Sequence, residues 1–150
     1  DGRRDPGLRR GGPAALMVVD TSALLAILQD EPERHAIADA IERAEARRVS
    51  AANFVEASVV LDARHGAEGI RMLDRLLEIA AIDVVPVDVQ QARLARDGWH
   101  RFGKGRHPAG LNFGDCFAYA LAMSLREPLL YKGEDFARTD VASALAAPAA

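Results

Sequence analysis

The chain has 150 residues, of which 19 are Lys or Arg and 22 are Asp or Glu, so its formal net charge is −3. Hydrophobic residues make up 49% and charged residues 27%, a balance typical of globular domains. This length fits one domain, and no apolar run is long enough to span a membrane. The single cysteine, Cys116, excludes an intrachain disulfide and a cysteine metal cluster, so we expect a cytoplasmic location.

Residues 1–16 differ from the rest of the chain. They are rich in Gly, Arg and Pro, with little to bury before Leu16. We expect a tail that is a cloning remnant or an overlong start, followed by one domain over residues 17–150. The tail carries four Arg and two Asp, a net charge of +2, which leaves −5 for the domain. An acidic domain of this kind binds nucleic acid only through a local basic patch or through metal ions.

Short apolar strands and amphipathic helices are predicted to alternate along the chain. In chain order we expect a strand at 16–20, helices at 23–28 and 33–47, a strand at 48–51, helices at 54–65 and 67–80, a strand at 82–88, helices at 89–102 and 112–127, and a strand at 128–133. Asn53 and Asn112 are expected to cap the helices that follow them, and Gly98 to interrupt the helix that contains it. The alternation predicts an α/β fold around a parallel sheet.

Four acids occupy corresponding places in these elements. Asp20 ends the first strand, Glu56 and Asp115 lie in the first turns of two helices, and Asp135 follows the last strand. A parallel sheet places all four at the edge where ligands bind, beyond the carboxyl ends of its strands. Each acid alone has a structural interpretation, since helix starts and turns favour carboxylates.

Together, the four carboxylates predict a metal site. Their mutual repulsion is relieved by a divalent cation. Oxygen ligands without His or Cys indicate Mg²⁺ or Mn²⁺ rather than Zn²⁺. Such a site suits phosphodiester hydrolysis, because the metal polarises the phosphate and a remaining carboxylate accepts a proton from water.

Four segments carry a family resemblance. MVVDTSALLAIL, AANFVEASVVL, LNFGDCFAYALA and LLYKGEDFARTD resemble, in order, the signature segments of PIN-domain ribonucleases, and most closely those of VapC toxins from bacterial toxin–antitoxin pairs. The FGKGRHPAGLN segment before the third is also similar to that group. The resemblance implies a three-layer α/β/α sandwich with a four- to five-stranded parallel sheet. It also implies Mg²⁺-dependent endonucleolytic RNA cleavage, with Mn²⁺ as a possible substitute, a homodimer, and a small antitoxin that covers the acidic groove.

The resemblance also implies roles for individual residues. The catalytic acids would be Asp20, Glu56, Asp115 and Asp135, with Asp20 and Asp115 holding the metal and with Ser22 and Asn53 supporting the acids. Glu134 and Asp140 are alternatives to Asp135 as the fourth acid.

The segment from Arg93 to His107 has a net charge of +4 within the acidic domain. Its glycine-rich part, 103–111, is expected to be a flexible loop in which Lys104 and Arg106 either bind the RNA backbone or are simply solvated. Trp99, Phe102 and His107 can stack on bases, but inward packing is favoured. A phosphate-binding loop is rejected, because position 105 is Gly where such a loop needs Ser or Thr. Cys116 is expected to be a buried thiol rather than a nucleophile.

Two other functions compete with the ribonuclease. A phosphatase or phosphotransferase would use Asp20 as nucleophile, but that chemistry usually needs a second Asp two residues later, where this chain has Ser22. A catalytically idle RNA- or protein-binding module is the second alternative, and the presence of all four acids argues against it.

Overall fold

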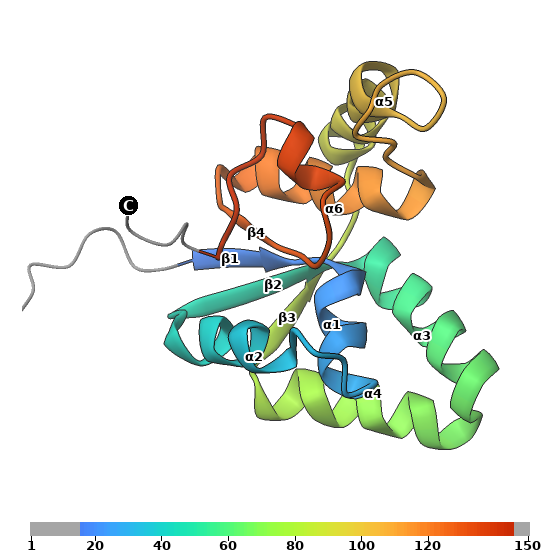
Figure 1. Ribbon diagram of the computed structural model, residues 1–150, viewed down its shortest axis with the longest axis vertical. Helices are drawn as coiled ribbons and strands as arrows, with labels where there is room; N and C mark the ends of the chain where they lie inside the picture. Colours follow the sequence, from blue (N-terminus) through green and yellow to red (C-terminus); the bar gives the residue numbers. More distant parts are fainter. Residues whose placement is uncertain (1–15, 146–150) are drawn as a thin grey trace, which may run out of the picture.

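A parallel sheet of four strands forms the centre of the computed structural model, which describes residues 16–145 (Figure 1). The strands are β1 (Leu16–Val19), β2 (Ala46–Ser50), β3 (Ile82–Val85) and β4 (Leu129–Leu130), paired in the order β3-β2-β1-β4. The expected tail lies outside the described residues except for Leu16, with which β1 begins. The predicted parallel α/β fold is therefore confirmed.

Helices cover both faces of the sheet. They are α1 (Thr21–Leu28), α2 (Arg34–Arg43), α3 (Ala51–His65), α4 (Ala67–Ile79), α5 (Val89–Phe102) and α6 (Phe113–Leu125), with a short 3₁₀ helix, η1 (Phe136–Arg138), after β4. In Figure 1, α1 to α4 lie below the sheet, and α5 and α6 lie above it. This arrangement gives the three-layer sandwich that the resemblance implied.

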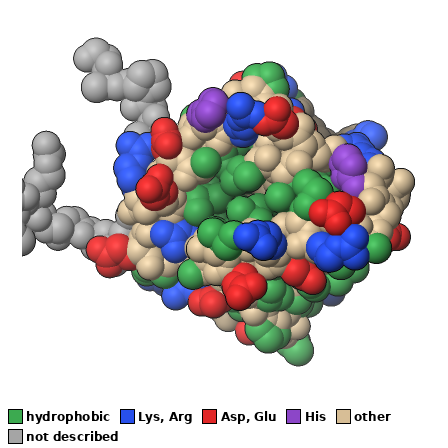
Figure 2. All heavy atoms as spheres, turned by 90° about the horizontal axis from the view of Figure 1, so that it is seen from below, with side chains coloured by type: hydrophobic (Ala, Val, Ile, Leu, Met, Phe, Trp, Pro, Cys, Tyr) green, Lys and Arg blue, Asp and Glu red, His purple; other side chains and the backbone are tan. Residues whose placement is uncertain are grey.

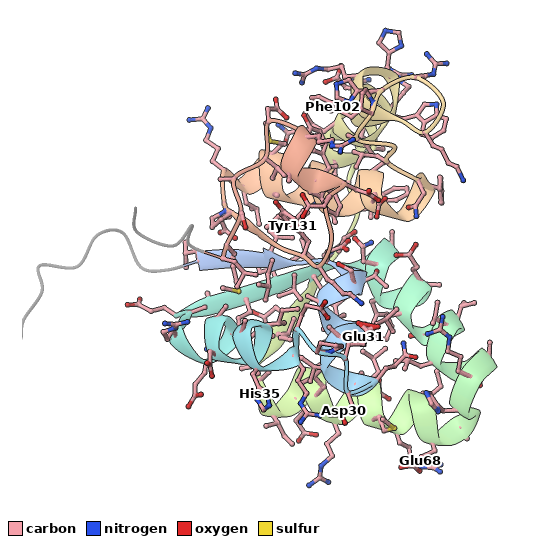
Figure 3. All side chains as sticks on the ribbon, in the orientation of Figure 1. Asp30, Glu31, His35, Glu68, Phe102 and Tyr131 are labelled. Carbon is pink, nitrogen blue, oxygen red and sulfur yellow. The ribbon has the colours of Figure 1, made fainter. Side chains whose placement is uncertain are left out.

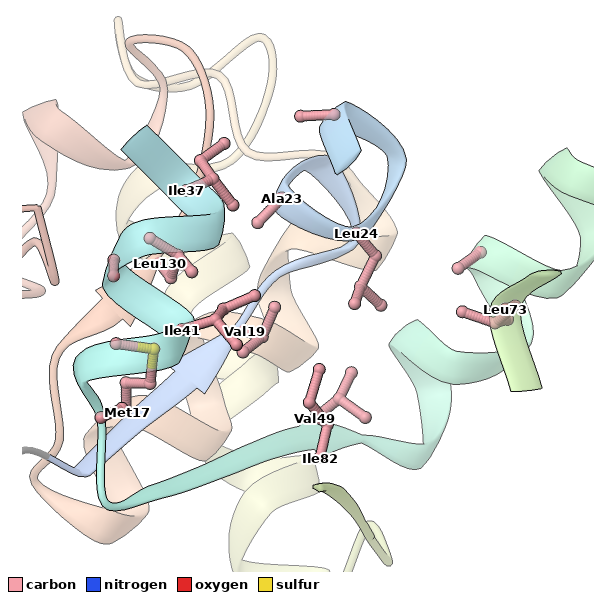
Figure 4. Packing of buried hydrophobic residues seen from close by; sticks show 14 of the residues in the cluster. Met17, Val19, Ala23, Leu24, Ile37, Ile41, Val49, Leu73, Ile82 and Leu130 are labelled. Carbon is pink, nitrogen blue, oxygen red and sulfur yellow. The ribbon is translucent and has the colours of Figure 1, made fainter. Parts of the chain in front are cut away.

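Two hydrophobic cores lie on opposite faces of the sheet. Met17 and Val19 of β1 pack with α1 to α4, whereas Val18 packs with α5 and α6. Figure 4 shows the first core, in which Leu24 and Ile41 lie close to Val19. Since successive strand residues point to opposite faces, one four-residue strand contributes to both cores.

Several predicted boundaries were wrong, among them the start of α1, the junction of α2 with β2 and the start of α3. Helix α2 ends at Arg43, because Ala46 and Arg47 already belong to β2, where the Arg47 guanidinium donates to three backbone carbonyls. Helix α3 begins at Ala51 with Ser50 as its N-cap, and the Ser50 hydroxyl accepts from the Ala52 N–H at 3.3 Å. Asn53 therefore does not cap this helix. It lies inside the first turn, with a fully buried side chain.

The predicted interruption at Gly98 was also wrong, because α5 continues from Val89 to Phe102. A Cβ atom at position 98 would lie 2.7 Å from Cδ1 of Tyr119 on α6. Glycine is therefore required for the close approach of two helices rather than for a break. The expected Asn112 cap is confirmed, since its side chain accepts from the Asp115 N–H. Within residues 16–145, no helix is both long and apolar enough to cross a membrane.

Candidate active site

Asp20 lies at the carboxyl end of β1 and is only 2% exposed. Its Oδ2 accepts hydrogen bonds from the Ser22 N–H at 3.0 Å and from the Ser22 hydroxyl at 2.6 Å, whereas its buried Oδ1 has no protein partner. Burial raises the pKa of Asp20 to about 7, and the charges of Asp115 and Glu56 add to this, against the Ser22 hydrogen bonds. The unpaired oxygen marks a position where a cation or a proton is needed.

Ser22 also connects Asp20 to the segment after β4. Its hydroxyl accepts a hydrogen bond from the backbone N–H of Lys132 at 3.0 Å while it donates to Asp20. The Lys132 ammonium donates to the Glu31 carboxylate at 2.9 Å, in the turn between α1 and α2. Ser22 therefore fixes the carboxylate and also the chain that leads toward Asp135.

Asn53 joins three helices beside Glu56. Its amide nitrogen lies 3.2 Å from Thr21 Oγ1, 3.0 Å from the Gly114 carbonyl oxygen and 3.4 Å from Glu56 Oε1, and Thr21 donates back to the Asn53 carbonyl. One buried amide thus holds the starts of α1, α3 and α6 together. Its position places Glu56, which is partly buried, next to the first turn of α6.

Glu56 comes very close to the backbone of α6 at Gly114. A Cβ atom at that position would lie 1.8 Å from Glu56 Oε2, so any larger residue would displace the carboxylate. Sequence reasoning missed Gly114 and the structural role of Thr21. The signal available for Gly114 was its place within a predicted helix, where glycine lowers helix propensity unless it has a packing reason.

Asp115 serves the helix and the site at once. Its Oδ2 accepts from the Asn112 N–H at 3.0 Å, and Asn112 Oδ1 accepts from the Asp115 N–H at 2.8 Å, which completes a capping box. Burial raises the pKa of Asp115 to about 6, and the charges of Asp135 and Glu56 raise it further, against the Asn112 hydrogen bond. The structural and functional interpretations of this acid are therefore compatible.

The segment after β4 separates the candidates for the fourth acid. Asp135, at the start of η1, is exposed and is the acid of this segment that raises the pKa of Asp115. Asp140 instead accepts hydrogen bonds from Tyr119 and Arg101. Glu134 is exposed on the same turn as Asp135. The structure thus brings Asp20, Glu56, Asp115 and Asp135 into one electrostatically coupled group.

This group fits a hard divalent cation held with few protein ligands. Among residues 16–145, no three His, Cys, Asp or Glu side chains form a set that could hold a metal ion by themselves. Mg²⁺ often binds through only one or two carboxylates and completes its shell with water and substrate phosphate. The unpaired Oδ1 of Asp20 and the raised pKa values of Asp20 and Asp115 are the features that such an ion would relieve.

Comparison with known proteins identifies the family. The sequence model of the PIN domain matches residues 17–142. This chain belongs to the PIN-domain family. It is 54% identical to Ribonuclease VapC28 of Mycobacterium tuberculosis over 130 residues, which cover 86% of this chain and 98% of that protein. It is 50% identical to Ribonuclease VapC of Mycolicibacterium smegmatis over 127 residues, 85% of this chain and 98% of that one.

A solved structure supports the fold of this PIN domain. The crystal structure of Mycobacterium tuberculosis VapC20, described as a sarcin–ricin loop cleaving toxin, superposes with a TM-score of 0.69 at 14% identity, over 83% of this chain and 95% of that one. With the curated relatives, this places the PIN domain among the VapC ribonucleases, as the four sequence segments indicated. The expected class of enzyme is thereby confirmed.

The basic loop of this PIN domain is compact rather than the open, flexible segment expected from its glycines. The Lys104 N–H donates to the Leu111 carbonyl, and the Leu111 N–H donates to the Phe102 carbonyl, both at 2.9 Å. The His107 ring accepts from the Ala109 N–H at 3.0 Å and packs edge-on against Phe102 at 5.1 Å. These contacts close the loop on itself and orient Lys104 and Arg106 from a defined backbone.

The aromatic side chains of this region divide between core and surface. Phe102, at the end of α5 in Figure 3, is buried as expected, and His107 packs on it. Trp99 is 38% exposed and lines a cleft of about 480 Å³ between α5 and α6, together with Lys104 and Phe117. Cys116 is buried, which confirms the expected buried thiol, and burial raises the pKa of this thiol to about 11.

Proposed function

We propose that this VapC-type PIN domain is a Mg²⁺-dependent endoribonuclease and the toxin of a toxin–antitoxin pair, with Mn²⁺ able to replace Mg²⁺. One observation carries the proposal: a fully buried carboxylate, Asp20, presents an unpaired oxygen beside Glu56 and Asp115. Buried charge without a partner is costly, so its presence at a strand end indicates a ligand.

In this mechanism Asp20 and Asp115 hold the metal. When bound, the cation supplies Lewis acidity to the scissile phosphate and lowers the pKa of a water. Ser22 occupies Oδ2 of Asp20 and so directs Oδ1 into the site, and Asn53 orients Glu56. Glu56 and Asp135, which the metal leaves free, orient the attacking water or accept its proton.

Lys104 and Arg106 are proposed to bind the RNA backbone. Lys104 lines the same cleft as Asn112, the residue that caps the helix carrying Asp115. Arg106 is exposed near His100, with its Nη1 3.5 Å from the ring nitrogen. Two cations on the loop that leads to Asn112 and Asp115 would let a polyanion approach an otherwise acidic domain.

We further propose a homodimer, a cognate antitoxin and a cytoplasmic location. Similar folds include a toxin–antitoxin complex from Klebsiella pneumoniae (TM-score 0.61, 17% identity, 83% of this chain and 92% of that one). Figure 2, seen from the α4 side, shows hydrophobic side chains that gather in a hollow ringed by charged ones. On the other side of the sheet, Phe113 is 79% exposed beside the α5–α6 cleft. Exposed apolar surface of this kind supports protein partners.

The test uses purified protein and labelled structured RNAs with Mg²⁺, with Mn²⁺ or with a chelator. Cleavage is expected only with metal, and Asp20→Asn should abolish it, whereas Asp74→Asn, which changes an exposed acid on α4, should not. Cleavage by Asp20→Asn at the full rate would refute the site. Release of phosphate from p-nitrophenyl phosphate without any RNA cleavage would instead favour the phosphatase.

A further inference from the structure

A polar cluster joins α5, α6 and the segment after β4. Its centre is the hydroxyl of Tyr119, a side chain that is 1% exposed on α6. This hydroxyl donates to Asp140 Oδ1 at 2.8 Å and accepts from Arg101 Nη1 at 3.2 Å, and Arg101 Nη2 reaches Asp140 Oδ2 at 3.3 Å. The Arg101–Asp140 pair is about 40% exposed and contributes little alone, so the buried hydroxyl is the principal tether of Asp140.

The tethered segment carries Asp135. At its base, the Leu129 N–H donates to the Ala142 carbonyl at 2.8 Å. Between Asp135 and Asp140 the chain forms η1, whose Phe136 is buried and packs against Tyr131, labelled in Figure 3. Only four residues lie between the two acids, and internal contacts hold them, so the place of Asp140 determines the place of Asp135.

The geometry of α6 links this tether to the candidate site. Tyr119 follows Asp115 by four residues, which puts both side chains on one face of the helix. Tyr119 therefore ties Asp140 to the helix that carries Asp115, from a residue one helical turn after that acid. The Arg138 guanidinium also donates to the Pro108 carbonyl at 3.3 Å, which ties the same segment to the basic loop.

We propose that Tyr119, together with Arg101 and Asp140, is a positioning residue that places Asp135 beside Asp115. This role rests on the proposed metal site, and it assigns Asp140 to the support of the fourth acid rather than to the acid itself. The proposed metal ligands, Asp20 and Asp115, do not belong to this cluster. Its effect reaches the site through the short segment that contains η1.

The test measures Mn²⁺ binding by titration calorimetry, without any RNA, for the full chain and its variants. Tyr119→Phe removes the hydroxyl and keeps the ring that packs on Gly98. We expect its affinity for Mn²⁺ to fall about five-fold, the effect of losing one neighbouring carboxylate at high dielectric. Asp135→Asn should weaken Mn²⁺ binding by the same factor. Combining Tyr119→Phe with Asp135→Asn should lower the affinity no further than Asp135→Asn alone.

Controls separate positioning from general destabilisation. Arg47→Lys alters partly buried hydrogen bonds near the start of β2, away from the candidate site, and should leave Mn²⁺ affinity unchanged. Asp140→Ala, at an exposed position, should reproduce Tyr119→Phe and supplies the test if that variant does not fold. The role would be overturned if the loss of affinity from Asp135→Asn added to that from Tyr119→Phe or to that from Asp140→Ala. Wild-type affinity in Tyr119→Phe would also overturn it. A wild-type chain that binds no Mn²⁺ would refute the proposed metal site itself, and this role with it.

Discussion

Removing the charge of Asp20 should stabilise the metal-free protein at alkaline pH. The pKa of Asp20 rises from 3.8 in the unfolded chain to about 7 in the fold. The folded state therefore holds the proton more tightly, and the free energy of unfolding falls as pH rises between these values. At about 1.4 kcal/mol per pKa unit, the ionised carboxylate costs about 4 kcal/mol above pH 8. Asn keeps an acceptor for Ser22 but leaves an amide unpaired, at a cost of about 1–3 kcal/mol.

The net expectation is that Asp20→Asn exceeds the wild type in free energy of unfolding by about 1–3 kcal/mol at pH 8. This advantage should shrink by about 3 kcal/mol at pH 5, where the wild-type carboxyl is protonated in the fold. Urea unfolding in a chelator at both pH values measures the difference, and Asp74→Asn serves as the exposed control. A variant that is less stable at pH 8, or a difference that does not change with pH, would refute the account of Asp20.

Three further predictions concern the same site. Mg²⁺ at about 100 times its dissociation constant should stabilise the wild type by about 2.7 kcal/mol in thermal unfolding and leave Asp20→Asn unchanged; equal shifts would contradict the ligand role. Gly114→Ala should slow RNA cleavage at least about ten-fold by displacing Glu56, while its melting temperature changes little because Ala favours the helix; an unaffected rate would show that Glu56 has room to move. The double variant Lys104→Ala, Arg106→Ala should reduce the slope of log RNA affinity against log salt concentration by about 1.4. Each phosphate contact on a single strand contributes about 0.7 to this slope. An unchanged slope would show that both side chains are solvated and do not bind phosphate.

Local patterns were sufficient for most of the elements and for one of the two predicted caps. Apolar periodicity located the strands and helices, and Asn112 caps α6 as expected. The cap of α3 was predicted wrongly because Ser50 and Asn53 are both cap-type residues three positions apart. The choice between them depends on Asn53 finding Thr21 and the Gly114 carbonyl on other helices.

The role of Gly98 also could not be predicted from the local sequence. Its sequence neighbourhood favours an interrupted helix, because glycine without context is unfavourable in a helix interior. The ring of Tyr119, 21 residues later, is what requires glycine there, since a Cβ would lie 2.7 Å from it. The compactness of the basic loop was missed for a similar reason. Its closure depends on the pairing of Lys104 with Leu111 and on the packing of His107 against Phe102.

The sequence by itself determined which chemistry is available and at which edge of the fold it lies. Acids that follow parallel strands or begin helices must meet at the carboxyl end of the sheet, because strand direction is shared along the sheet. Only the tertiary structure decided how these acids are used: Asp20 has an unpaired oxygen, Asp135 approaches Asp115, and Asp140 is bound by Tyr119 and Arg101. Burial and hydrogen bonds between distant segments set these differences, and such contacts leave no periodic signal in the chain.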